Sequence, residues 1–167
     1  FTLDERNGHW QRALMMRLPV AATVNPHVFF YGFAGVACAS AGNCATGGQY
    51  RDASGTYQAF VVNEVKGVWR DATRVALPAG ASAGHNGGVV ALACTAAGTC
   101  RAGAAYLDAS GNYQALLLSE TGNAWHTSQT VTLPGGATSV GVAGGVYALV
   151  CTAQDHCVAA GSYLANA

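Results

Sequence analysis

Residues 88–134, GVVALACTAAGTCRAGAAYLDASGNYQALLLSETGNAWHTSQTVTLP, decide the fold. Four short runs at 88–95, 99–107, 113–120 and 124–134 are rich in apolar, β-branched and aromatic residues, and turn residues separate them. Such runs are typical of β-strands, and the D-A-S-G segment between the second and third has the composition of a hairpin turn with a left-handed glycine. The sequence therefore predicts a four-stranded antiparallel meander that a proline ends.

The landmarks of this stretch occur three times along the chain. Paired cysteines with C-x5-C spacing recur after 56 and 57 residues, and a tyrosine follows each pair after six residues. Each tryptophan lies five residues after a glutamate and nine before a proline. We therefore predict one domain, 1–167, with repeats at 32–78, at 88–134 and at 142–167, the last completed by 1–19. The landmarks are Cys38, Cys44, Cys94, Cys100, Cys151 and Cys157; Tyr50, Tyr106 and Tyr163; Glu5, Glu64 and Glu120; and Trp10, Trp69 and Trp125.

The third repeat is split between the two ends of the chain. Residues 1–19, FTLDERNGHWQRALMMRLP, align with residues 60–78, FVVNEVKGVWRDATRVALP, so that Phe1 corresponds to Phe60. The segment CVAAGSYLANA at 157–167 contains the second strand of the same motif. We expect strands from the two ends to pair and complete a sheet, because pairing removes two exposed edges. The partner strand could come from the same chain or from a neighbour.

Repeated four-stranded meanders with fixed landmarks are typical of β-propeller blades. The predicted fold class is all-β, with three four-stranded antiparallel propeller-type blades. A β-prism-like monomer with threefold symmetry is the alternative, and a β-trefoil fits less well because its units are shorter. Since propellers usually have about four to eight blades, we predict a homodimer in which two chains form a six-bladed ring.

The composition limits the partners. Half of the 167 residues are apolar, a tenth are charged, and eight basic side chains balance eight acidic ones. This balance argues against nucleic acid as a partner. No apolar run approaches the roughly 20 residues of a membrane-spanning helix, so we predict no membrane span.

The cysteine spacing predicts three local disulfides, Cys38–Cys44, Cys94–Cys100 and Cys151–Cys157. Short turns would place both cysteines of each pair opposite one another on adjacent strands. Because such bonds persist in oxidising compartments, we predict a secreted, extracellular protein. Zinc is the alternative, but the histidine near one pair, His156, has no counterpart in the other repeats. We therefore predict no metal and no other cofactor.

The repeated aromatic and acidic residues are the candidate ligand-binding residues. Aromatic faces stack on sugar rings and carboxylates accept hydrogen bonds from hydroxyls, so the pattern favours a lectin-like, carbohydrate-binding protein with one site per blade or blade junction. The same residues could instead pack as core between blades. The alternative function is a structural, assembly or protease-interacting module with protein partners. The candidates are Trp10, Trp69, Trp125, Glu5, Glu64, Glu120, Tyr50, Tyr106 and Tyr163.

No catalytic motif is present, and we predict a non-enzymatic protein without catalytic residues. Hydrolysis by paired carboxylates needs one protonated and one ionised group, whereas the three glutamates stand at equivalent positions. The histidines share no repeat position and are predicted to lie on the surface or in loops: His9, His27, His85, His126 and His156.

The composite motif C-x5-C, G-x-Y-x-D-x-x-G-x-x-Q-A, Glu, G-x-W and LP resembles the repeats of secreted bacterial β-propeller proteins. These are of the actinobacterial type and similar to the dispase autolysis-inducing protein. The resemblance covers almost the whole chain. It implies a secreted, non-enzymatic propeller, and it implies no catalytic residue.

Overall fold

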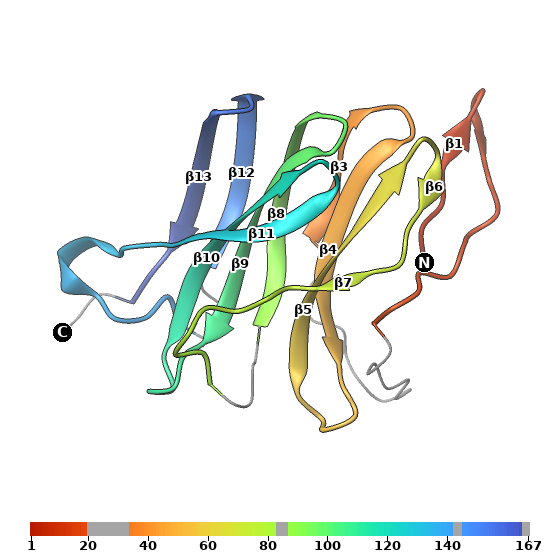
Figure 1. Ribbon diagram of the computed structural model, residues 1–167. Coiled ribbons are helices and arrows are strands. Elements are labelled where there is room, and N and C mark those ends of the chain that lie inside the picture. The colour runs from red at the N-terminus through yellow and green to blue at the C-terminus, as the bar shows by residue number, and fades with distance from the viewer. Residues whose placement is uncertain (20–33, 83–86, 142–144, 165–167) are drawn as a thin grey trace.

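The computed structural model describes residues 1–19, 34–82, 87–141 and 145–164 (Figure 1). Within these ranges the protein is all-β: antiparallel strands are joined by tight turns, and the single helical element is a short 3-10 turn at Pro134–Gly136. None of the sheets formed by these residues closes into a barrel. No helix in the described ranges has the length and apolar character needed to cross a bilayer. The all-β expectation is confirmed.

The middle sheet matches the stretch from which the fold was predicted. Its strands are β8 (Gly87–Ala96), β9 (Thr99–Leu107), β10 (Tyr113–Thr121) and β11 (Ala124–Thr130), in the order β11-β10-β9-β8. All neighbouring strands are antiparallel. The four-stranded meander is therefore confirmed in this repeat.

The first sheet follows the same order but its fourth strand is broken. Its strands are β3 (Ala34–Ser40), β4 (Asn43–Arg51), β5 (Tyr57–Val65), β6 (Val68–Trp69) and β7 (Thr73–Arg74), and both β6 and β7 pair with β5. The break has an identifiable cause. Between β6 and β7, the Arg70 N–H still donates to the Asn63 carbonyl of β5, but the Ala72 N–H donates to the carbonyl of Arg17 in the N-terminal segment, each at 2.8 Å.

The third sheet has two strands, β12 (Gly145–Ala153) and β13 (His156–Ser162). At the other end of the molecule, the N-terminal segment, residues 1–19, forms a hairpin of β1 (Glu5–Arg6) and β2 (His9–Trp10). Among the described residues, the two ends of one chain therefore do not make the predicted pairing. The reason is topological, since the first and middle sheets lie between the two ends (Figure 1).

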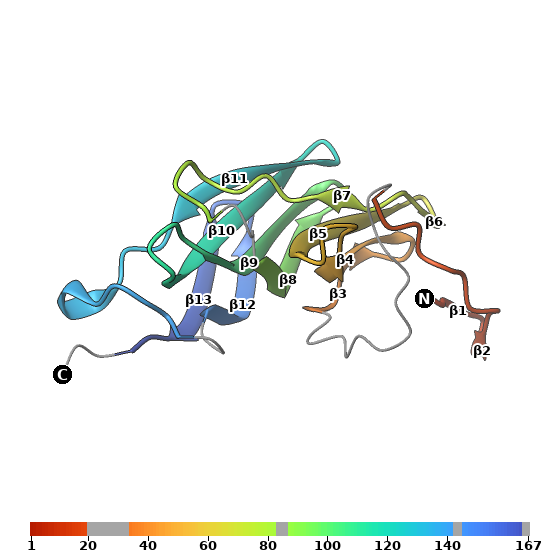
Figure 2. The same ribbon diagram turned by 90° about the horizontal axis from the view of Figure 1, so that it is seen from below.

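The sheets stack face to face in sequence order. Strand β8 packs on β3, β4 and β5, and β12 packs on β8, β9 and β10. Figure 2 shows the same succession from below, with the N-terminal segment beyond the first sheet. The order of elements through the stack is thus N-terminal segment, first sheet, middle sheet, third sheet.

Strand β5 is buried on both faces because it lies inside this stack. Successive side chains of a strand point to opposite faces. Val61 joins a core cluster with Val89 and Leu116 of the middle sheet. Phe60 and Val62 instead join a cluster that Met16 and Leu18 of the N-terminal segment cover. Each such buried side chain contributes roughly 1.5–3 kcal/mol, so the alternating apolar residues hold β5 between two layers.

Glycines allow the close approach of successive sheets. A Cβ added at Gly103 on β9 would lie 2.6 Å from Cβ of Val146 on β12. At the equivalent position on β4, a Cβ on Gly47 would lie 3.0 Å from Cβ of Val89 on β8. The same glycine-to-valine contact therefore sets the spacing at two successive junctions.

Candidate functional site

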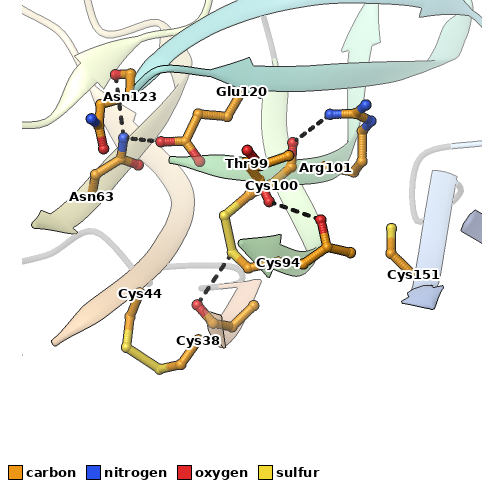
Figure 3. The surroundings of a disulfide bond; sticks show 12 residues. Cys38, Cys44, Asn63, Cys94, Thr99, Cys100, Arg101, Glu120, Asn123 and Cys151 are labelled. Carbon is orange, nitrogen blue, oxygen red and sulfur yellow. Dashed lines mark hydrogen bonds between the residues drawn. A yellow bond between two sulfur atoms is a disulfide. The ribbon is translucent and has the colours of Figure 1, made fainter. Parts of the chain in front are cut away.

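The three predicted disulfides are confirmed. Each bond joins directly opposed residues on the first two strands of a sheet: Cys38–Cys44, Cys94–Cys100 and Cys151–Cys157. The bond in the middle sheet also touches the first sheet, since Cys94 Sγ lies 3.5 Å from the Ala37 carbonyl oxygen (Figure 3). Disulfides of this kind are consistent with an extracellular protein.

The junction between the first and middle sheets is closed by a buried polar network (Figure 3). Glu120 and Trp125 are opposed across β10 and β11. Asn63 of β5 donates from Nδ2 to Glu120 Oε1, 2.5 Å away, and its Oδ1 accepts from Trp125 Nε1 at 2.8 Å. One amide thus uses both its ends to hold a glutamate and a tryptophan of the next sheet.

Glu120 is the acidic group of this network, and only 2% of its surface is exposed. Burial raises the pKa of Glu120, while hydrogen bonds from the Asn63 side chain and the Cys100 backbone act in the opposite direction. Its second oxygen, Oε2, is buried and has no hydrogen-bond partner among the described residues. The environment therefore favours the protonated carboxyl more than water does.

The junction between the first sheet and the N-terminal segment repeats part of this geometry. Glu64 and Trp69 are opposed across β5 and β6. Trp69 Nε1 donates to Asp4 Oδ1 at 3.3 Å. Asp4 precedes the glutamate of its own repeat, as Asn63 does. Burial also raises the pKa of Glu64, Asp4 raises it further, and Arg6 lowers it.

The third set of candidates is exposed. Glu5 and Trp10 are opposed on β1 and β2, and Trp10 is 67% exposed. Tyr163 is 45% exposed, whereas Tyr50 and Tyr106 are buried. The Glu–Trp pairs lie at one end of their hairpins, and the two buried tyrosines pair with Gln58 and Gln114 toward the Asp-Ala-Ser-Gly turns. The structure therefore does not gather the nine candidates into one pocket.

A cleft brings four of the candidates together. It has a volume of about 810 Å³ and lies between the start of the N-terminal segment and strands β3 and β4. The four candidates in its lining are Glu5, Trp10, Glu64 and Trp69. The Cys38–Cys44 disulfide and Val36 line the opposite wall.

The Asp-Ala-Ser-Gly turns, 52–55 and 108–111, contain a set of hydrogen bonds to the aspartate, here called the clamp, that the sequence analysis missed. Asp108 Oδ1 accepts from the backbone N–H groups of Ser110 and Asn112, both at 2.9 Å, and its Oδ2 accepts from Gln114 Nε2 at 2.8 Å. Asp52 and Gln58 repeat this arrangement at 2.7 Å. The available signal was the glutamine that follows each of these aspartates by six residues.

Hydrogen bonding lowers the pKa of both turn aspartates. For Asp52 the Ser54 hydroxyl is the largest cause, and the pKa falls to about 2. For Asp108 the Asn112 backbone N–H is the largest cause. The left-handed glycines predicted for these turns are confirmed at Gly55, φ +87°, and Gly111, φ +83°.

The histidines are the remaining candidates for a polar site. His9, His126 and His156 are exposed, while His27 and His85 lie outside the described residues. No group of three His, Cys, Asp or Glu side chains in those ranges could hold a metal ion. Of the repeated residues, Glu120 and Trp125 bond between sheets, and Trp69 bonds to the N-terminal segment.

Comparison with family models, with curated proteins and with solved structures found no match to this chain.

Proposed function

We propose that the protein is a secreted, non-enzymatic module of propeller-type blades that acts through contacts with other protein surfaces. The observation that carries this proposal is the double use of Asn63, which binds Glu120 and Trp125 at the first closed junction. The Asn63 amide, Glu120 Oε1 and the Trp125 indole N–H are already bonded across the junction, and Glu120 is buried, so these groups are not available to a glycan. The repeated residues thus serve assembly of the stack.

The repetition of contacts supports blades as the architecture. The middle and third sheets each place their first strand on the preceding sheet, and the indoles of Trp69 and Trp125 each bond to an Asx residue of the preceding segment. Blades of a propeller need such a step that recurs from one sheet to the next. The three local disulfides support secretion.

Carbohydrate binding is the second candidate function, and the cleft is the observation that favours it. Trp10 offers an exposed indole there, and Glu5 and Glu64 offer carboxylates. Stacking on an indole and hydrogen bonds to carboxylates suit a sugar ring. This site would be single, at the N-terminal junction, instead of repeated at every junction.

A glycan array probed with the native chain and with Trp10→Ala tests the choice. The assembly proposal expects no glycan to be retained by either protein. Retention by the native chain that is lost in Trp10→Ala and kept in Trp125→Phe would overturn it in favour of carbohydrate binding at the cleft. The Trp125→Phe protein is the matched control because its indole belongs to the closed junction.

A further inference from the structure

We infer that the outer edge of β13 is a docking site for residues 1–6 of a second copy of this chain, so that two copies exchange strands. This inference rests on the proposed assembly function and names its partner. The two surfaces are complementary halves of one sheet: β12 and β13 are the first two strands, and the N-terminal segment contains the last two.

The N-terminal segment folds as the outer half of a sheet. Its pairs Thr2 with Leu14 and Glu5 with Trp10 repeat the pairs Val61 with Thr73 and Glu64 with Trp69 of the first sheet. The backbone bond from Gln11 N–H to the Asp4 carbonyl repeats that from Arg70 to Asn63, both at 2.8 Å. The segment therefore has the geometry of a third and fourth strand, with no first or second strand beside it in the described structure.

The third sheet has the opposite deficiency. All seven residues of β13 are exposed, and β12 is its partner strand in the described structure. Val158 in its centre is 68% exposed. The equivalent residue of the first sheet, Ala45, is fully buried. An open edge with exposed apolar residues is a template for strand addition.

The internal repeat fixes the expected register. In the first sheet β4 pairs with β5 through Thr46 with Val62 and Gly48 with Phe60. When Cys44 is aligned with Cys157 and Phe60 with Phe1, these pairs become Ala159 with Leu3 and Gly161 with Phe1. The second copy's residues 1–6 would thus run antiparallel to β13.

This register would bury the apolar residues that are exposed at both ends. Phe60 is 1% exposed and packs edge-on against Tyr50, with ring centroids 6.2 Å apart. The equivalent residues, Phe1 and Tyr163, are 78% and 45% exposed and belong to opposite ends of the chain. Strand exchange brings this aromatic pair together between two copies.

The cleft has the position that the added strands require. It separates residues 1–6 from β3, on the side where β13 and β12 of a second copy would continue the sheet. At the closed junction Cys94 contacts Ala37 of the preceding sheet. The equivalent contact would join Cys38, in the cleft wall, to Val150 of the second copy, which is 64% exposed here.

A second copy fits better than the same chain because the two halves lie at opposite ends of the stack (Figure 1). Reciprocal exchange gives each copy one completed sheet and leaves neither edge open. The assembly is then a closed dimer, in which every sheet has a neighbour on both sides. The chain's six cysteines are all paired, so cysteines introduced by substitution can report the contact.

The test mixes the single variants Leu3→Cys and Ala159→Cys under mild oxidation and analyses them on a non-reducing gel. We expect a cross-linked species of twice the 16.9 kDa chain mass. We call the contact between β13 and the second copy's residues 1–6 the seam. The matched control pairs Leu3→Cys with Ser110→Cys, an exposed turn residue outside the seam, and should give no cross-linked species. Light scattering of the native chain should give a dimer.

A charge in the seam should weaken the dimer. Phe1→Asp should raise the dissociation constant by about tenfold or more, because it removes the burial of a large aromatic side chain. Met15→Asp, at a position that is 92% exposed and outside the seam strand, should leave it unchanged. Equal loss in both variants would overturn the proposed register.

The remaining outcomes are distinct. A native monomer without cross-linking, which also binds no glycan, overturns the second copy as partner and leaves protein binding as the function. A double variant carries both Leu3→Cys and Ala159→Cys in one chain. If its two new cysteines form a disulfide while the protein stays at monomer mass, strand exchange is overturned, and residues 1–6 pair with β13 of the same chain. Glycan binding that depends on Trp10 overturns the proposed function itself.

Discussion

The two junctions on either side of the first sheet use the same kinds of residue with different results. At the junction with the middle sheet, Glu120 and Trp125 are fixed by Asn63 and the contact is closed. At the junction with the N-terminal segment, Trp69 meets Asp4, but a cleft of about 810 Å³ remains. The difference is the set of neighbouring strands, since the middle sheet faces a complete sheet and the first sheet faces half of one. Burial of the landmarks is therefore decided by the partner strands and not by the residue type.

Removing the amide of the closed junction should have the largest effect. Asn63→Ala takes away the donor to Glu120 and the acceptor for Trp125, leaving two polar groups unpaired in a buried site. We expect a loss of about 2–4 kcal/mol in the free energy of unfolding, measured by urea denaturation. The matched variant at the open junction, Asp4→Ala, should cost under about 1 kcal/mol because that contact is longer and partly exposed. Equal losses would show that the two junctions do not differ in burial.

Adding a methyl group at the tight junction between the middle and third sheets should have the second-largest effect on stability. Gly103→Ala would place a Cβ 2.6 Å from that of Val146, so the third sheet must shift, at a cost of about 1–3 kcal/mol. Gly35→Ala on β3 is the control, since nothing lies within 4 Å of its added Cβ. Thermal unfolding of both variants checks the difference. A stable Gly103→Ala protein would contradict the tight spacing of the stack.

The buried carboxyl should make the closed junction sensitive to pH. Because burial raises the pKa of Glu120, its contribution to stability is complete below the unfolded pKa of about 4.3 and is lost as pH rises through the higher folded pKa. Glu120→Gln should flatten this decline in the free energy of unfolding above that pH. Glu5→Gln, at the exposed equivalent, should leave the decline as in the native chain. Urea titrations at several pH values measure both slopes.

The turn clamps should give a smaller effect of opposite sign. The pKa of Asp52 is lowered to about 2, so its contribution is complete above the unfolded value of about 3.9 and is lost as pH falls through the folded value. Asp52→Asn should therefore remove part of the acid-induced loss of stability, and only a small part, because this turn is exposed. Asp155→Asn, whose carboxylate is 93% exposed, is the control. If Asp52→Asn lost as much stability on acidification as the native chain, the proposed contribution of the Asp52 hydrogen bonds would be contradicted.

Features encoded within one hairpin could be predicted from the sequence. The C-x5-C pairs and the Asp-Ala-Ser-Gly turns are local, and the strands of 88–134 begin within one residue of their expected starts. The fourth strand was expected to run to the proline at 134, but it ends at Thr130. The break in the first sheet's fourth strand could not be predicted, because it depends on a bond from Ala72 to Arg17, far away in sequence. The roles of Asn63 and Asp4 were missed for a similar reason. They act between repeats, and the residue at that position changes from Asp to Asn to Ser119 along the chain.

The three tryptophans occupy equivalent positions in three different surroundings, which makes the chain its own optical reporter. Trp125 and Trp69 are half-buried and hydrogen-bonded through their indoles, and Trp10 stands in solvent. A soluble quencher should therefore reach Trp10 first, and the red edge of the emission should belong to it. Any partner that covers the N-terminal segment would shift the Trp10 emission to the blue, while Trp125, at the closed junction, serves as the internal reference.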